Sequence, residues 1–439
     1  MTSEAPAECF VYITLPGQTE PVTAGRFVLS VDRRGTPEGR FVYGRSYLER
    51  ANAVALDPIE LKLSPRTYST AALNGVFGAL RDANPDYWGR RLIQRHLGKT
   101  QPGEMEYLLY SPDDRAGALG FGLNQTPPAP KRSFNQTIDL AKVQAIADSI
   151  VADDDRPDGD HAAAGADDHA DDRDQVEKLM VIGTSMGGAR PKAVVENEAG
   201  LWIAKFNRPD DTWNSARVEH AMLILARACG LTTAESRVIE VAGRDVLLVK
   251  RFDREKTQAG YLRARMISAL TLLRTEDTYQ SRDKWSYVLL AEEVRRVCAD
   301  PAQNVAELFR RMSFNALISN IDDHPRNHAL IAKEAEWKLS PAYDLTPAVP
   351  VSMERRDLAL ECGDAGRFAN AGNLLSQSAR FLLEPGEAAA MIDAMEAQVR
   401  GTWYATARAA GVSERDCERI ATAFVYPGFR QSPEQRQGS

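Results

Sequence analysis

The chain of 439 residues lacks the features that mark several common classes of protein. Its five cysteines are scattered and form no C-x-x-C pair. This argues against a disulfide framework or a zinc ribbon, and it favours a reducing compartment. No apolar run approaches the roughly 18 residues of a membrane span, and the first residues contain no basic region leading into an apolar one. We therefore expect a cytoplasmic protein with no membrane partner.

Long runs of lysine and arginine are also missing, and the net charge is −7. Residues 153–174 contain ten aspartates and two arginines, so this stretch alone is more negative than the whole chain. The remainder is close to neutral, which argues against nucleic-acid binding by the chain alone. The stretch has no apolar side chain larger than alanine and cannot repay the entropy of ordering, so we expect a disordered acidic insertion.

The most informative feature present is the segment 320–327, which reads Asn-Ile-Asp-Asp-His-Pro-Arg-Asn. Asp322 and Asn327 are five residues apart, the spacing at which a protein-kinase catalytic loop places its base and a metal-binding asparagine. Asp344 follows, and a short hairpin over 328–331 and 337–339 would return the chain to this place. A carboxylate can orient a hydroxyl and accept its proton, while an amide oxygen and a second carboxylate can hold Mg²⁺ on nucleotide phosphates. An aspartate-rich turn before proline is also common in solvated loops.

Upstream segments follow in the order of a two-lobed kinase. They are a glycine-rich turn at 181–192, an apolar strand at 201–206 with Lys205, a helix over 215–229 with Glu219, and a strand at 246–249 that runs into Lys250 and Phe252. The glycine-rich turn is the weakest match because it lacks the G-x-G-x-x-G spacing. Chance gives one such segment easily and the ordered set rarely.

The pattern predicts an α+β protein with a two-lobed protein-kinase-like fold, preceded by an N-terminal α/β subdomain. We expect four regions: the N-terminal subdomain at 1–125, a helix with the acidic insertion at 126–180, the nucleotide-binding lobe at 181–255, and the helical catalytic lobe at 256–430. Alternating apolar residues predict strands at 10–14, 25–31 and 39–43. Helical periodicity predicts helices at 71–82, 87–97 and 138–151, one containing Val305 to Ala316, and a helical tail at 387–422.

Six motifs resemble one known family, the HipA-type serine/threonine-protein kinase toxins of bacterial type II toxin–antitoxin modules. The similarity covers roughly residues 9–425. The motifs lie at 77–90, 114–121, 183–192, 251–254, 322–327 and 343–344.

The resemblance implies a role for each matching position. Asp322 would be the catalytic residue, with Asn327 and Asp344 as ligands of Mg²⁺. Autophosphorylation at Ser185 would be an off-switch. His324 would be a structural residue that holds the catalytic loop in place, and not a general base. ATP would be bound by Lys205 paired with Glu219, by the loop glycines Gly187 and Gly188, and by backbone groups near Lys250 and Phe252.

The same resemblance implies an ATP- and Mg²⁺-dependent serine/threonine kinase that arrests growth. Its protein substrate would be a translation component such as an aminoacyl-tRNA synthetase. A helix-turn-helix antitoxin would be its partner, and DNA would be contacted only through that antitoxin. The chain departs from the family pattern at Asp323, where glycine is expected, and at Tyr343-Asp344-Leu345, which replaces Asp-Phe-Gly. The extra carboxylate of Asp323 could bind a counter-cation or alter access of the acceptor, and the sequence leaves its effect open.

Two other interpretations stay open at this point. The first is a small-molecule phosphotransferase of the antibiotic-kinase type, which also uses D-x-x-x-x-N and a later aspartate. The second is an inactive scaffold that binds a DNA-binding antitoxin. The intact set of Lys205, Asp322, Asn327 and Asp344 argues against the scaffold. Ser185 could also be a turn serine with no regulatory role.

Overall fold

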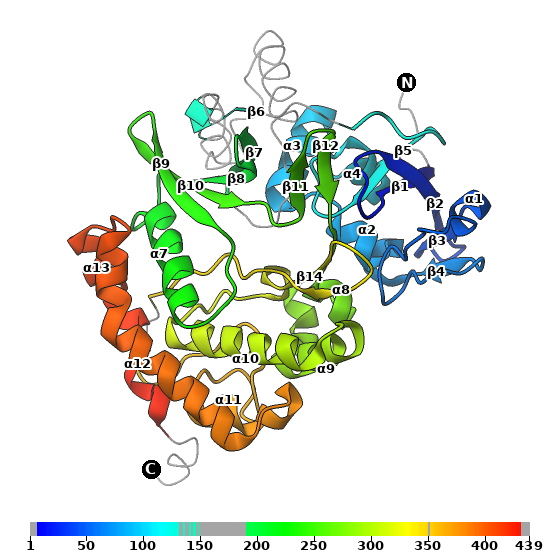
Figure 1. The fold of residues 1–439 in the computed structure, drawn as a ribbon. Coiled ribbons are helices and arrows are strands. Elements are labelled where there is room, and N and C mark those ends of the chain that lie inside the picture. Colours follow the sequence, from blue (N-terminus) through cyan, green and yellow to red (C-terminus); the bar gives the residue numbers. More distant parts are fainter. Residues whose placement is uncertain are drawn as a thin grey trace. The chain divides into compact units, whose positions relative to one another are not determined.

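The computed structural model describes residues 7–130, 135–136, 140–141, 144–145, 148, 190–349 and 352–431. The chain divides into two compact units (Figure 1). The first comprises residues 1–210, 240–267 and 332–335, and the second comprises 211–239, 268–331 and 336–439. The acidic stretch 153–174 and the loop residues Ser185, Gly187 and Gly188 lie outside the described residues, as does most of the helix expected at 138–151.

The N-terminal part of the first unit is built on a five-stranded antiparallel sheet. Its strand order is β4 (Tyr68–Thr70), β3 (Pro37–Tyr43), β2 (Pro21–Val31), β1 (Glu8–Thr14) and β5 (Leu119–Gly122). The helices of this part are α1 (Arg45–Leu48), α2 (Gly78–Asp82), α3 (Tyr87–Leu97) and α4 (Glu104–Tyr110). The three strands expected from alternation are confirmed. The helix expected at 87–97 is also confirmed: Asp86 caps it by accepting from the Gly89 amide, and Gly98 ends it in the left-handed region with φ 61°.

The single helix expected at 71–82 is wrong. The structure divides this segment into the 3₁₀ turn η1 (Ala72–Gly75) and α2. Leu73 and Asn74 both have positive φ, 52° and 57°, which interrupts the helical path. The cause is a close backbone approach, because a Cβ on Gly39 of β3 would lie 1.7 Å from the Gly75 carbonyl oxygen. The apolar periodicity alone gives no sign of this approach.

The second sheet of this unit contains the strands expected for a nucleotide lobe. Its order is β6 (Asn135–Gln136), β7 (Lys192–Asn197), β8 (Gly200–Phe206), β10 (Arg244–Lys250) and β9 (Ser236–Val241). The strands expected at 201–206 and 246–249 are confirmed as β8 and β10. Trp202, Leu247 and Leu248 are fully buried in this sheet. The chain continues into the hairpin β11 (Arg254–Thr257) and β12 (Gly260–Arg263), and then into β13 (Arg265–Ser268).

A buried ion pair ties the second sheet to the residue that caps α3. The Lys192 ammonium at the start of β7 lies 2.6 Å from Asp86, and the two side chains are only 4% and 3% exposed. The antiparallel register also places Lys192 directly opposite Lys205 on β8. Like charges opposite each other destabilise a sheet, so the carboxylate of Asp86 offsets a repulsion that this register creates.

The second unit is mostly helical. Its helices are α7 (Ser215–Ala228), α8 (Ala269–Leu273), α9 (Tyr287–Val297), α10 (Pro301–Leu317), α11 (Ala371–Ser376), α12 (Pro385–Ala409) and α13 (Glu414–Ile420). Short 3₁₀ turns are η3 (Tyr279–Lys284), η4 (Pro325–Asn327), η5 (Ser378–Phe381), η6 (Ala421–Ala423) and η7 (Pro427–Arg430). A hairpin joins β14 (Ala329–Ala332) to β15 (Lys338–Leu339), confirming the hairpin expected after the segment 320–327.

Helix α10 is the central support of this unit. It packs against α9 and α12, as can be followed in Figure 1. The face expected from periodicity, which includes Val305, Phe309 and Met312, is fully buried. The tail forms two helices rather than one, because Gly411 adopts φ 83° between α12 and α13. Within the described ranges, no helix combines the length and apolarity needed to cross a bilayer.

Candidate functional site

The segment 320–327 begins where α10 ends. Ser319 has φ 54°, and the Asn320 amide donates back to the Asn315 carbonyl at 2.8 Å, which turns the chain away from the helix axis. Positive φ in a residue other than glycine is costly and is often found at functional sites. The helix therefore holds the start of the turn on a rigid support.

Backbone hydrogen bonds fold residues 322–327 into a tight turn. The His324 amide donates to the Asp322 carbonyl at 2.8 Å, and the Asn327 amide donates to the His324 carbonyl at 2.9 Å. Pro325 opens the 3₁₀ turn η4 with a fixed φ. The Asp322 side chain is exposed, and no described residue donates a hydrogen bond to its carboxylate. Its oxygens are thus available to an acceptor hydroxyl.

Asp344 is brought to the same turn by the β14–β15 hairpin. Its neighbour Tyr343 donates its hydroxyl hydrogen bond to the Arg326 carbonyl at 2.7 Å, which joins the segment of Asp344 to the segment of Asn327. Asp344 itself has φ 59°. A left-handed aspartate held by surrounding structure is the kind of strain found where a side chain must be aimed.

The electrostatics of this site are set by clustered carboxylates. Partial burial raises the pKa of Asp322 above its ordinary value of 3.8. The charges of Asp344, Asp323 and Asp277 raise this pKa further, while His324 opposes them. Carboxylates that raise one another's pKa are close in space, and a bound cation would relieve their repulsion.

The residues present fit a magnesium ion. Asn327 is buried, and its amide nitrogen donates weakly to the Asp322 carbonyl at 3.4 Å. This orientation leaves the amide oxygen without a donor among the described residues, as the predicted role of metal ligand requires. Among the residues that the structure describes, no cluster of three or more His, Cys, Asp or Glu could hold a metal. Two protein oxygens completed by phosphates and water are typical of Mg²⁺ sites.

Asp323 does not play the part expected of it. Its side chain is 1% exposed, accepts a hydrogen bond from the Tyr287 hydroxyl and lies 3.0 Å from His328 Nε2. A carboxylate enclosed in this way can neither bind a solvated counter-cation nor meet an acceptor, which answers the question that the sequence left open. His324 supports the turn through its backbone, and its buried ring atom Nδ1 has no hydrogen-bond partner among the described residues.

The nucleotide-binding candidates that the structure describes are Lys205, Glu219, Lys250 and Phe252. Lys205 is half-buried on β8, and Lys250 ends β10 with its ammonium 5.8 Å from the centre of the Trp202 ring. Both belong to the first unit, as does Phe252. Glu219 is buried on α7 in the second unit. The pairing of Lys205 with Glu219 and the adenine contacts near Lys250 and Phe252 stay predictions.

The motif at 251–254 has a structural role that the sequence did not indicate. Arg251 and Arg254 both pair with Asp253, at 2.8 and 2.7 Å, and all three side chains are at most 2% exposed. The same guanidiniums donate to the Arg115 carbonyl, and the Gly117 amide donates to Asp253 at 2.9 Å. Two motifs of the resemblance, 114–121 and 251–254, therefore lock the N-terminal part to the segment that follows β10 within the first unit.

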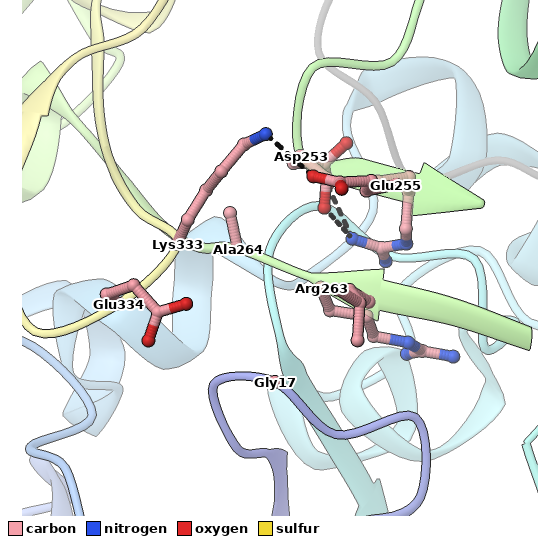
Figure 2. A pocket seen from close by; sticks show the side chains of 9 residues that line it. Gly17, Asp253, Glu255, Arg263, Ala264, Lys333 and Glu334 are labelled. Carbon is pink, nitrogen blue, oxygen red and sulfur yellow. Dashed lines mark hydrogen bonds and ion pairs between the residues drawn. The ribbon is translucent and has the colours of Figure 1, made fainter. Parts of the chain in front are cut away.

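A small pocket lies beside this lock, and it is distinct from the candidate site. Figure 2 shows Asp253, Arg263 and Glu334 in its wall, with Lys333 reaching to Glu255 at 2.9 Å. Its charged lining is balanced in sign. The residues Asp322, Asn327 and Asp344 do not line it.

Sequence reasoning missed three side chains that matter to the turn: Tyr287, His328 and Arg326. Arg326 forms an ion pair with Asp277 at 2.6 Å, which ties the turn to the segment after α8. A signal for His328 was present, because Asp323 and His328 repeat the five-residue spacing of Asp322 and Asn327 one position later. Nothing local pointed to Tyr287, which is 36 residues away from Asp323 in sequence.

The fold and this turn define a kinase-like α+β protein, and comparisons identify its family. Residues 22–122 match the model of the HipA N-terminal domain, and residues 184–403 match that of the HipA-like C-terminal domain. The chain belongs to the HipA family. The resemblance seen in the motifs is thereby confirmed.

Curated relatives include proteins named as kinases and as a toxin. The chain is 32% identical over 151 residues to the candidate kinase Y4mE of Sinorhizobium fredii, covering 34% of each chain. It is 29% identical over 183 residues to the toxin YjjJ of Escherichia coli, covering 38% of this chain and 39% of that protein. The matches thus span only about a third to two fifths of these two relatives.

A solved structure confirms the fold over almost the full length. HipA of Shewanella oneidensis, solved with HipB and operator DNA, superposes with a TM-score of 0.64 at 17% identity. The match covers 94% of both chains. The α+β kinase-like fold expected from the motif order is confirmed.

Proposed function

We propose that the protein is an ATP- and Mg²⁺-dependent serine/threonine-protein kinase that acts as a growth-arrest toxin. The observation that carries the proposal is the turn 322–327. It presents an exposed Asp322 carboxylate that no described residue donates to, beside the oxygen of Asn327 and the strained Asp344. A base and two hard oxygen ligands in this order are what phosphoryl transfer requires.

The proposed reaction moves the γ-phosphoryl group of ATP to a protein hydroxyl. The hydroxyl oxygen forms a bond to the γ-phosphorus, the bond from that phosphorus to the bridging oxygen breaks, and ADP leaves. Asp322 orients the hydroxyl and accepts its proton. Asn327 and Asp344 would hold a Mg²⁺ ion, which would supply positive charge against the phosphates when bound.

Other groups of the chain would bind the nucleotide. Lys205 would contact the α- and β-phosphates, with Glu219 fixing its ammonium. Gly187 and Gly188 would let the backbone approach the phosphates closely. Backbone groups near Lys250 and Phe252 would meet the adenine edge. These assignments rest on the position of each residue in the family motifs.

Growth arrest and regulation follow from family membership. The proposed protein substrate is a translation component, with an aminoacyl-tRNA synthetase as the first candidate. The structural relative from Shewanella was solved with HipB and operator DNA, which supports a helix-turn-helix antitoxin as partner and DNA contact through it. Autophosphorylation at Ser185 would add negative charge beside the ATP phosphates and reduce ATP binding.

The first prediction concerns Asp344→Asn and the metal. Loss of the carboxylate weakens Mg²⁺ binding while Asn327 and the ATP phosphates still hold the ion. Mutation of a residue that only hydrogen-bonds to a metal ligand typically lowers metal affinity by about 10- to 100-fold. Loss of a ligand itself should cost at least as much, so the half-activating Mg²⁺ concentration is expected to rise at least about tenfold. The measurement is transfer of labelled phosphate from ATP to lysate proteins over a Mg²⁺ titration, followed by phosphoamino-acid analysis.

Different outcomes separate the candidate functions. Label on protein serine or threonine that disappears with EDTA supports the kinase. Label only on aminoglycosides or other small molecules would assign the chain to the antibiotic-type phosphotransferases. Absence of any ATP-dependent transfer, with retained binding of an antitoxin, would indicate the inactive scaffold. An Asp344→Asn variant with an unchanged Mg²⁺ requirement would remove Asp344 from the metal site.

A further inference from the structure

In the second unit, a chain of hydrogen-bonded, buried polar side chains connects the proposed catalytic turn to helices α9 and α10. The side-chain amide of Asn320 donates to the side-chain oxygen of Asn315 at 3.1 Å. The side-chain amide of Asn315 donates to the Tyr287 hydroxyl at 3.1 Å. Tyr287 donates in turn to Asp323, which lies 3.0 Å from His328 Nε2. All five side chains are at most 2% exposed. Such a network is stable only if its members satisfy one another.

The network closes the turn a second time. The first closure is the bond from the Asn327 side chain to the Asp322 carbonyl. The second closure joins the next residue at each end of the turn, His328 and Asp323, through their side chains. Tyr287 is the first residue of α9 and Asn315 is in the last turn of α10, so two helices hold the second closure. The ring of His328 also packs edge-on against Tyr287, with 5.3 Å between ring centres.

We propose that Tyr287 and Asp323 are positioning residues of the kinase, which fix the turn so that Asp322 and Asn327 keep their productive geometry. This inference rests on the proposed kinase function. Asp323 is drawn inward by Tyr287 and His328, while its neighbour Asp322 is exposed. The inward bond of one aspartate thus fixes the backbone that carries the other.

The chemistry of the network favours a positioning role over a stabilising one. A buried carboxylate is costly to desolvate, and apolar residues of similar size often stabilise such a site as well or better. What a network of mutually bonded polar side chains provides is one defined arrangement of the backbone around it, and in this one only the His328 ring atom Nδ1 is buried without a partner among the described residues. Phosphoryl transfer needs a fixed position of the catalytic side chains, because a misplacement of the reacting groups by about 1 Å can reduce the rate by roughly 100-fold.

The test compares two variants that each lose one buried phenol hydroxyl in the second unit. Tyr287→Phe removes two hydrogen bonds, the one donated to Asp323 and the one accepted from Asn315. The matched control, Tyr426→Phe, removes a bond of 3.0 Å to the Ala369 carbonyl, which lies outside the turn. Tyr426 is 1% exposed and Tyr287 is fully buried, so the two substitutions are made at similarly buried residues. The measurements are kcat, KM for ATP, thermal unfolding, and hydrogen–deuterium exchange of the peptide containing residues 322–328.

Tyr287→Phe is expected to lower kcat by about 10- to 100-fold while KM for ATP stays within about twofold. The amides of His324 and Asn327 should exchange faster, because their turn is less constrained. Tyr426→Phe should lose less thermal stability, because it removes one bond to a neutral carbonyl, and should keep the wild-type kcat and exchange. Asp323→Asn retains the acceptor for Tyr287 and should fall between wild type and Tyr287→Phe, which also provides a variant if Tyr287→Phe fails to fold.

Equal kcat values for Tyr287→Phe and Tyr426→Phe, or equal exchange in residues 322–328, would overturn the inference. Failure of the kinase proposal is a separate result, since it would appear as absent transfer by the wild type. The exchange comparison still decides in that case whether Tyr287 fixes the turn. Faster exchange only in Tyr287→Phe supports the role, and identical exchange removes it.

Discussion

Asp322→Asn is expected to reduce phosphate transfer by about 10²- to 10⁴-fold, the range that a general base contributes. The fold should be retained, because the Asp322 carboxylate is exposed and accepts no hydrogen bond from a described residue. An amide can still occupy the space but cannot take the proton of the acceptor hydroxyl. The measurement is the initial rate of labelled phosphate transfer, with circular dichroism to confirm the fold.

The matched control for this variant is Asp357→Asn. Asp357 is an exposed aspartate of the same unit, paired with Arg355 at 3.0 Å and outside the catalytic turn. It should transfer phosphate at the wild-type rate. In a bacterial host, expression of the wild type and of Asp357→Asn should arrest growth, and Asp322→Asn should not. Full transfer by Asp322→Asn would end its assignment as the base.

The same variant should also be more stable than the wild type at neutral pH. Burial and neighbouring carboxylates raise the pKa of Asp322 above its ordinary value of 3.8, so the folded state binds the proton more tightly than the unfolded state. Stability therefore falls as pH rises from about 4 through the raised pKa, and the full cost is present above it. Asp322→Asn removes this cost, so its advantage in Tm without Mg²⁺ should disappear below about pH 4.

The parts that the sequence predicted correctly depend on local patterns. The spacing of Asp322 and Asn327 is visible along the chain because both residues belong to one short turn. The buried strand at 201–206 and the helix over 215–229 show their periodicity within a few residues. The hairpin after the turn is also local, which is why the sequence alone was enough to predict that Asp344 returns to the turn.

The parts that failed depend on contacts between distant residues. The break at Leu73 and Asn74 comes from the approach of Gly75 to Gly39 on another strand. Asp323 looked like an exposed extra charge because Tyr287, which encloses it, lies on another helix. The charged side chains of the motif at 251–254 face the backbone at 114–117, a contact that no local pattern indicated. No single-sequence pattern reports such pairings.

Asp253→Ala is expected to cause the largest loss of stability in the chain, at the upper end of the roughly 3–5 kcal/mol seen when a buried ion pair loses one partner. Asp253 neutralises two guanidiniums, Arg251 and Arg254, and both are at most 2% exposed. Without it, two buried positive charges lie close together against the backbone of residues 114–117. Chemical denaturation of the full chain, followed by circular dichroism, measures the change.

The pH dependence of this effect has a defined sign. Burial alone would raise the pKa of Asp253, but the charges of Arg251 and Arg254 outweigh it and hold the pKa far below its ordinary value of 3.8. The stability that Asp253 contributes is therefore complete above about pH 4 and is lost as the pH falls further. The control Asp357→Ala breaks an exposed pair and should cost less than about 1 kcal/mol at any pH. If Asp253→Ala cost no more than this control, the two motifs would not form the lock between the N-terminal part and the segment that follows β10.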